Sequence, residues 1–256
     1  MSSSVGGSKR QQKVGGMAAL YLAAAFVVAM PFFLVFVKYP SVVDPVEKVA
    51  LLVSNQGGMR IMYLVTYVIF GLVLAVLALA LYARLRDGAP ILAQAATAVG
   101  LIWAFALVAS GLIFNAGMAA VVGLHGADPA QAASAWQAIE PVAQGLGGSG
   151  GELLGGLWVL LVSVAALRTG GLPKALGWLG VAVGAAGVVS VVPALNDLAY
   201  GFGLLVIVWF AGLGVAMLRT TSRAAAPAGV AATASASAAA SSTPRPSSPQ
   251  RSRITA

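Results

Sequence analysis

The sequence alternates long apolar stretches with short polar segments. Almost wholly apolar runs of about twenty residues occupy positions 17–37, 61–82, 96–121, 151–167, 175–195 and 198–218. Because a helix rises about 1.5 Å per residue, a run of this length spans the roughly 30 Å hydrocarbon core of a bilayer. The pattern predicts an all-α fold, an integral membrane bundle of about six transmembrane helices.

The segments outside these runs divide the chain into three parts. Residues 1–16 are rich in serine and glycine, and the C-terminal segment consists mainly of Ala, Ser, Thr and Pro. The first apolar run exceeds the length of about 7–15 residues that is typical of a signal peptide, so we expect an uncleaved span, kinked at Pro31. We therefore predict a cytoplasmic segment at 1–16, a transmembrane domain at 17–218 and a disordered cytoplasmic tail at 219–256.

The distribution of charge predicts the orientation of the spans. The chain has 15 Lys and Arg, 7 Asp and Glu and a formal net charge of +8, with 59% hydrophobic and only 9% charged residues. Basic residues concentrate at both ends and in the turns 84–90 and 168–173, which is the positive-inside pattern and not a nucleic-acid-binding surface. We expect both termini in the cytoplasm, a cell (inner or plasma) membrane location and no nucleic-acid partner.

The two longer loops on the opposite side carry matching helix-start signals. Asp44-Pro45-Val46-Glu47 and Asp128-Pro129-Ala130-Gln131 each supply an N-cap residue, a proline at the first helical position and a capping-box partner. We expect each to begin a short helix at the outer membrane interface, which either has a role there or simply closes the bundle. The expected apolar stripes consist of Val46, Val49, Ala50 and Val53 in the first helix and of Ala132, Trp136 and Ile139 in the second.

Glycines recur at helical spacing in and before the fourth and fifth spans. Gly147, Gly151 and Gly155 are four residues apart, as are Gly180 and Gly184. Small residues with this spacing allow helix backbones to approach closely in lipid. We expect the two spans to pack against each other or against the same neighbour.

Few polar residues lie within or beside the apolar runs, and these are the candidates for a ligand-binding site or a polar network. They are Glu152, Asn115, Asn196, Asp197 and His125. Glu152 is the ionisable residue expected nearest to membrane depth, where a charge needs a partner or water; alternatively, the helix dipole stabilises it at the start of a span. We assign no metal, no cofactor and no catalytic residue.

One motif suggests chemistry. Gly147-Gly148-Ser149-Gly150 is similar to the GxSG motif of rhomboid intramembrane proteases, but the sixth span lacks the histidine that pairs with the serine in that family. A serine without a base is a weak nucleophile. An intramembrane, hydrolase-like enzyme that uses Ser149 or Glu152 therefore stays an alternative.

Two basic turns carry a family resemblance. Leu81-Tyr82-Ala83-Arg84-Leu85-Arg86 precedes Pro90, and Ala166-Leu167-Arg168 precedes Gly171-Leu172-Pro173-Lys174-Ala175-Leu176-Gly177-Trp178-Leu179-Gly180. With these segments the chain resembles a bacterial membrane family, the domain of unknown function 4386, from about residue 17 to residue 219. The resemblance implies a multi-pass membrane protein and carries no catalytic residues.

These observations favour a non-enzymatic membrane module. Its expected partners are the lipid bilayer and a small ligand or a membrane protein. The hypothesis is that the protein binds or passes a small ligand or lipid, or regulates a membrane partner.

Overall fold

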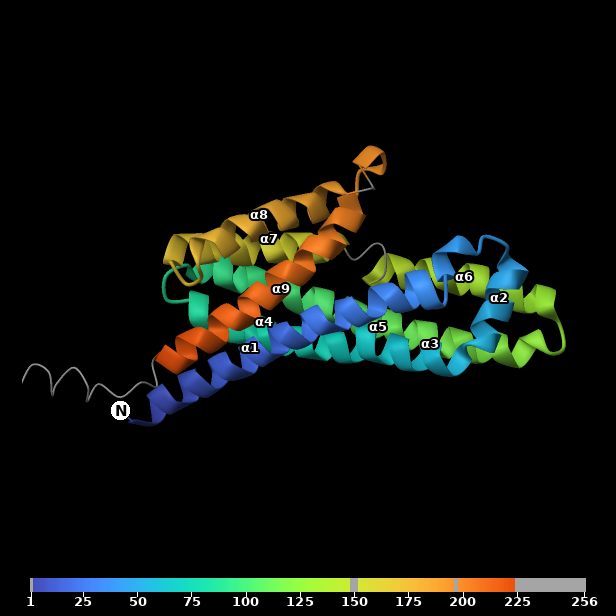
Figure 1. Cartoon of the computed structure of the whole chain (residues 1–256), viewed down its shortest axis with the longest axis horizontal. Coiled ribbons are helices and arrows are strands. Elements are labelled where there is room, and N and C mark those ends of the chain that lie inside the picture. The colour runs from blue at the N-terminus through green and yellow to red at the C-terminus, as the bar shows by residue number, and fades with distance from the viewer. Residues whose placement is uncertain (1, 148–151, 196–197, 224–256) are drawn as a thin grey trace, which may run out of the picture. The chain divides into compact units, whose positions relative to one another are not determined.

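The computed structural model describes residues 2–147, 152–195 and 198–223, and every regular element in these ranges is helical (Figure 1). The predicted all-α fold is therefore confirmed. Contacts group residues 1–221 into one compact unit. Predictions for residues outside the described ranges stay predictions; they concern Ser149, Gly151, Asn196, Asp197 and the tail from residue 224 onward.

The main helices follow one another with short connections. In chain order they are α1 (Ser2–Pro31), α2 (Pro45–Ser54), α3 (Gln56–Tyr63), α4 (Phe70–Leu85), α5 (Pro90–His125), α6 (Pro129–Gly147), α7 (Glu152–Thr169), α8 (Lys174–Val189) and α9 (Leu198–Arg223). A π-helical turn, Phe32–Phe36, follows α1, and a second, Leu64–Ile69, joins α3 to α4.

Several helical stretches are long and apolar enough to cross a membrane. Among the described residues they are Arg10–Phe36, Gln56–Leu85, Pro90–His125 and Gly201–Arg219. A further candidate is the segment Pro129–Thr169, of which residues 129–147 and 152–169 are described. The remaining apolar run forms α8, which has 16 residues. Together these stretches account for the apolar runs of the sequence, as expected for a membrane bundle.

α8 is shorter than the sequence predicted. The apolar run continues to residue 195, but the helix ends at Val189. Pro193 disfavours the helical conformation in the residue before it. The Ser190 hydroxyl also donates a hydrogen bond to the carbonyl of Gly187 at 2.8 Å, which satisfies a backbone acceptor at the helix end.

α1 and α9 pack antiparallel. Gly15 of α1 lies next to Met217 of α9, whereas Gly203 near the start of α9 lies next to Met30 near the end of α1. The beginning of α1 and the end of α9 therefore lie at the same end of this unit.

The two basic turns meet at this end as well. The Arg84 Nε donates a hydrogen bond to the carbonyl of Gly171 at 2.8 Å, which links the turn after α4 to the turn after α7. A Cβ atom on Gly88 would lie 2.7 Å from the Thr169 Cγ2, and one on Gly15 would lie 2.7 Å from the Cβ of Ala80. The basic turns and the start of α1 consequently share one end of the bundle, which we call the basic end.

The apolar interior forms two clusters that follow α5. This helix has 36 residues, a length of about 54 Å, and it contributes to both clusters. The larger cluster includes Leu74, Leu77, Trp103, Trp158 and Trp209. The smaller includes Val49, Leu52, Phe114, Met118 and Trp136.

Both predicted helix starts are confirmed. The Asp44 Oδ1 accepts hydrogen bonds from the backbone N–H groups of Val46 and Glu47, each at 2.9 Å. The Asp128 Oδ1 accepts one from the N–H of Gln131 at 2.9 Å. These carboxylates satisfy first-turn donors that the helix itself leaves unpaired.

The two outer helices bury side chains against the rest of the protein. In α2 the buried residues are Val49 and Leu52, whereas Val46 is 42% exposed and Ala50 is also exposed. Of the expected stripe, Val49 is thus buried in the protein, and Val46 and Ala50 lie on its exposed surface. α6 has 19 residues, buries Trp136 and packs along α5 and α2. Both helices thus turn their buried side chains toward the protein, and that packing selects the face.

Glycines bring α7 and α8 into backbone contact (Figure 1). A Cβ atom on Gly156 would lie 2.7 Å from the backbone nitrogen of Val188 and 2.8 Å from the carbonyl oxygen of Gly184. Gly180, one turn earlier on α8, lies against the side chain of Ser163 on α7. Gly184 and Gly180 from the predicted glycine set thus lie along this interface.

The other described glycines of that set pack on α5. Gly147 ends α6, where its Cβ position is 2.9 Å from the Cα of Leu107. The Cβ position of Gly155, on α7, is 2.8 Å from the Cζ2 of Trp103. α5 is therefore the neighbour that α6 and α7 share.

Candidate functional site

A π-helical turn interrupts the first span directly after Pro31. Proline has no N–H group and disturbs the regular helical ladder. In the following turn the N–H of Val37 donates to the carbonyl of Phe32 at 2.9 Å, five residues back. The sequence predicted a kink at Pro31, and the structure places a π-helical turn beside it. Such turns frequently occur at functional sites.

A second π-helical turn, Leu64–Ile69, lies in the neighbouring span and contacts α1. The Tyr21 hydroxyl of α1 donates to the carbonyl of Val65 at 2.9 Å, and the Thr66 hydroxyl donates to the carbonyl of Met62 at 2.7 Å. Both bonds supply partners to backbone carbonyls in an apolar environment, where an unpaired carbonyl is costly.

The two π-helical turns border one cavity of about 420 Å³. Phe33 and Leu34 line it from the first turn, and Thr66 and Tyr67 line it from the second. Tyr67 packs against both apolar clusters, so the cavity lies where the clusters meet. A cavity of this volume is large enough for a small organic ligand.

Aromatic rings form much of the cavity wall. Phe26 of α1 meets Phe70 of α4 edge to face, with ring centroids 5.3 Å apart and an interplanar angle of 89°. Phe70 also contacts Trp103 of α5, at 6.3 Å between centroids. Phe202 adds a ring from α9. Four helices thus contribute aromatic side chains to one apolar pocket.

Glu152 is the acidic residue among the described lining residues. It occupies the first position of α7, where the positive end of the helix dipole stabilises a negative charge. Its side chain is half-buried. The lining therefore combines apolar residues with an acid and two hydroxyl-bearing residues, Thr66 and Tyr67, the composition of a ligand site that fixes orientation through a few polar groups.

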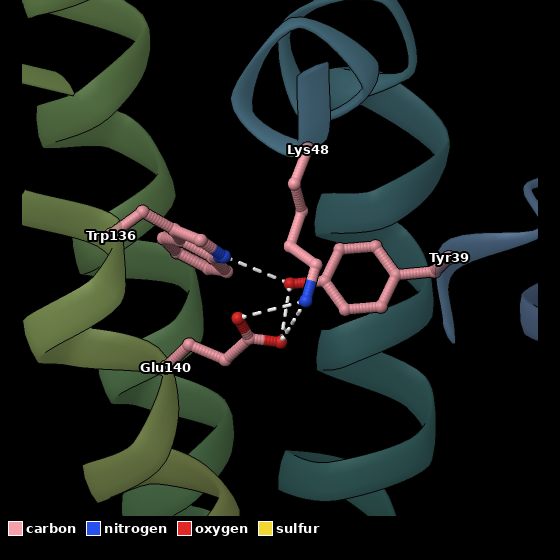
Figure 2. A network of polar contacts seen from close by, with 4 residues as sticks. All are labelled: Tyr39, Lys48, Trp136 and Glu140. Atoms are coloured by element: carbon pink, nitrogen blue, oxygen red, sulfur yellow. Dashed lines mark hydrogen bonds and ion pairs between the residues drawn. The ribbon is translucent and has the colours of Figure 1, made fainter. Parts of the chain in front are cut away.

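A separate polar network includes Tyr39 and Trp136, which belong to the smaller apolar cluster (Figure 2). The Trp136 Nε1 donates to the Tyr39 hydroxyl at 2.8 Å, and that hydroxyl donates to the Glu140 Oε1 at 2.8 Å. The Lys48 Nζ lies 3.3 Å from the Glu140 Oε2 and 5.0 Å from the centre of the Tyr39 ring. The network joins Tyr39, in the segment between α1 and α2, to Lys48 on α2 and to Trp136 and Glu140 on α6.

Partial burial strengthens the ion pair of this network. The side chains of Lys48 and Glu140 are 20% and 17% exposed, so water screens their ion pair less than it screens a surface pair. Burial raises the pKa of the Tyr39 phenol well above its ordinary value, and the nearby Glu140 carboxylate raises it further. Tyr39 therefore remains a neutral donor at physiological pH.

The comparison with known families shows the family to which the chain belongs. Residues 17–199 match the family described as domain of unknown function (DUF4386). The chain belongs to the DUF4386 family. No curated protein and no solved structure matches it. The region that matches the DUF4386 family contains both π-helical turns, Trp103 and Glu152, whereas the lining residue Phe202 lies after it.

Glu152, one of the predicted ligand-binding candidates, lines the pocket of this DUF4386 protein, as does Gly147 from the predicted glycine set. Asn115 lies on α5 outside the lining, and its amide donates to the carbonyl of Gly111 at 3.0 Å. His125 ends α5, also outside the lining, and its Nδ1 has no hydrogen-bond partner among the described residues. Asn196 and Asp197 lie outside the described ranges.

Sequence reasoning missed two groups of residues in this family member. Tyr67 and Thr66 line the pocket, and Tyr39 with Lys48 forms the outer network. A tyrosine inside an apolar run was a usable signal for Tyr67. The partners in the network are 92–101 residues apart in the chain, so no local pattern connects them. No cluster of three or more His, Asp or Glu that could hold a metal occurs in the described part of the chain.

Proposed function

We propose that this DUF4386 protein is a non-enzymatic membrane module that binds a small apolar or lipid-like molecule in the pocket beside Glu152. The observation that carries the proposal is the cavity of about 420 Å³ between the two π-helical turns. Its apolar walls suit a ligand that arrives through the bilayer, and Glu152, Thr66 and Tyr67 supply polar contacts.

The depth of the pocket fits such a ligand. Trp103 follows Pro90, the first residue of α5 at the basic end, by 13 residues, a distance of about 20 Å along the helix. With the basic end at the inner membrane surface, the pocket would lie within the roughly 30 Å hydrocarbon core. Lipid is therefore the proposed immediate environment of the ligand.

The proposal places the basic end and both termini in the cytoplasm and the protein in the cell membrane. The gathering of the basic turns at one end supports this orientation. Because the chain contains no cysteine, single cysteines can be labelled with a membrane-impermeant maleimide on intact cells. We expect labelling of Val43→Cys, between α1 and α2, and none of Asp87→Cys. The reverse pattern would invert the orientation.

Native mass spectrometry of protein purified in mild detergent tests ligand binding. We expect wild type to carry a small molecule at fixed stoichiometry and Gly203→Leu to carry less, because Gly203 lines the pocket and its Cβ position is 3.7 Å from the nearest described atom, in Met30. Gly201→Leu is the matched control on the same helix, since no described atom lies within 4 Å of its Cβ position.

Two outcomes would count against the binding role. Equal amounts of the same lipids on wild type, Gly203→Leu and Gly201→Leu would identify them as surface lipid and refute the proposal. If the purified protein carries another polypeptide and no small molecule, regulation of a membrane partner would instead be favoured.

A further inference from the structure

The acidic and basic residues that line the pocket are not matched. Its described lining residues include the acid Glu152 and no Lys, Arg or His. A carboxylate in apolar surroundings is costly unless a cation or several donors accompany it. A ligand with a positive charge would supply that partner, whereas an anionic ligand would add a second negative charge to the same apolar space.

The walls favour the same kind of ligand. Phe26, Phe70 and Trp103 form a chain of contacting rings, with centroids 5.3 Å and 6.3 Å apart at the two contacts. Phe33, Tyr67 and Phe202 also belong to the aromatic lining. Faces of aromatic rings attract cations, and this attraction strengthens where water is excluded. Quaternary ammonium groups in particular are held by such aromatic surroundings.

We infer that the ligand is a cationic amphiphile, an amine or quaternary ammonium group attached to an apolar tail. This inference rests on the proposed function, because it assigns the chemistry of the molecule in the same pocket. The ammonium group lies between Glu152 and the aromatic rings, and the tail lies along the apolar residues contributed by α1. The volume of about 420 Å³ admits a ligand with one ring and a short chain.

A phospholipid of net negative charge is not the expected ligand. An anionic headgroup would meet the Glu152 carboxyl without a lining cation to neutralise it. A neutral apolar molecule would fill the cavity without using the charge of Glu152. These three ligand charges therefore predict different affinities for the same pocket.

Three probes of similar shape test this ranking. They are (4-phenylbutyl)trimethylammonium, its neutral carbon isostere 5,5-dimethylhexylbenzene and the anion 6-phenylhexanoate. Each is titrated into purified protein in one detergent, and the dissociation constant is obtained from the shift of the thermal unfolding midpoint. The proteins are wild type, Glu152→Gln, Gly203→Leu, which fills the pocket, and Glu47→Gln. The last variant is the control for Glu152→Gln, because it makes the same change at an exposed glutamate that does not line the pocket. Comparison of the variants in one detergent removes the partitioning of each probe into micelles.

We expect the ratio of the cation's affinity to that of the neutral isostere to be at least tenfold higher in wild type than in Glu152→Gln, and the ratio of the anion's affinity to that of the neutral isostere to be lower in wild type. Glu152→Gln removes the preference for the cation but still binds the neutral probe, which also shows that this variant is folded. Glu47→Gln behaves as wild type. Gly203→Leu weakens the binding of the cation and of the neutral probe alike.

Failure of the inference and failure of the proposed function give different results. If Glu152→Gln leaves the ratio of the two affinities unaltered while Gly203→Leu weakens the binding of both probes, the inference is overturned and the pocket remains a binding site without a preference for cations. If Gly203→Leu leaves the affinity for every probe unchanged, both the inference and the proposed function are overturned.

Discussion

Addition of one methyl group at Gly184 should separate α7 from α8. The Cβ atom of Gly184→Ala would lie 2.6 Å from the backbone nitrogen of Leu160 and 2.7 Å from the carbonyl oxygen of Gly156. Ordinary contacts of a Cβ atom begin near 3.4 Å. Because the opposing atoms belong to the backbone, no side chain can rotate away, and the helices must move apart by roughly 0.7 Å at this point.

The expected cost follows from that movement. A gap of about 0.5–1 Å loses a quarter to a half of the dispersion attraction between the facing atoms. Overpacking of this kind costs about 1–3 kcal/mol. Alanine in place of glycine recovers up to about 1 kcal/mol through its higher helix propensity. We therefore expect Gly184→Ala to lower the free energy of unfolding by about 1–2 kcal/mol.

The assay is reversible unfolding in detergent, followed by tryptophan fluorescence. Gly123→Ala is the matched control, because Gly123 is exposed on α5 and no described atom lies within 4 Å of its Cβ position. It should leave stability unchanged or raise it by up to about 1 kcal/mol. If Gly184→Ala is as stable as Gly123→Ala, the close approach of α7 and α8 is not a property of the folded protein.

Further predictions use the same assay. Ser110→Ala should lower the free energy of unfolding by about 1 kcal/mol, because it removes a bond of 2.7 Å to the carbonyl of Ala143 that links α5 to α6; an unchanged value would contradict that bond. Ser163→Ala should be neutral or stabilising, since this buried hydroxyl has no partner among the described residues, and a clear loss would reveal a partner. Tyr39→Phe should cost about 1–3 kcal/mol at neutral pH by leaving the Trp136 N–H unpaired. Because burial raises the pKa of Tyr39, its neutral form contributes fully below about pH 10 and less as pH rises above that value. Wild type should thus lose more stability than Tyr39→Phe between about pH 10 and pH 11, and parallel profiles would refute the role of the phenol.

Local signals predicted most of the fold. The apolar runs marked the spans, and Asp44 and Asp128 marked helix starts that the structure confirms through side-chain bonds to first-turn N–H groups. Such signals depend on neighbours within a turn or two, so the sequence alone carries them. The end of α8 was predicted less well, because hydropathy does not register that Pro193 and Ser190 end the helix at Val189.

Tertiary packing determined what the sequence could not predict. Glu152 was a candidate because a charge beside an apolar run is unusual, but Phe26, Trp103 and Phe202 have nothing in their local sequences that assigns them to one pocket. The buried face of α2 also depended on a neighbour, since α2 packs on α6 and buries Leu52, which is not part of the predicted stripe, together with Val49, which is.

The shortness of α8 has a consequence for the surrounding membrane. Its 16 residues span about 24 Å, some 6 Å less than a typical hydrocarbon core of about 30 Å. Lipid beside a short helix thins locally, at a cost of a fraction of a kcal/mol for each ångström of mismatch. The protein should therefore favour thin bilayers, and its stability in vesicles should fall as the acyl chains of the lipid lengthen.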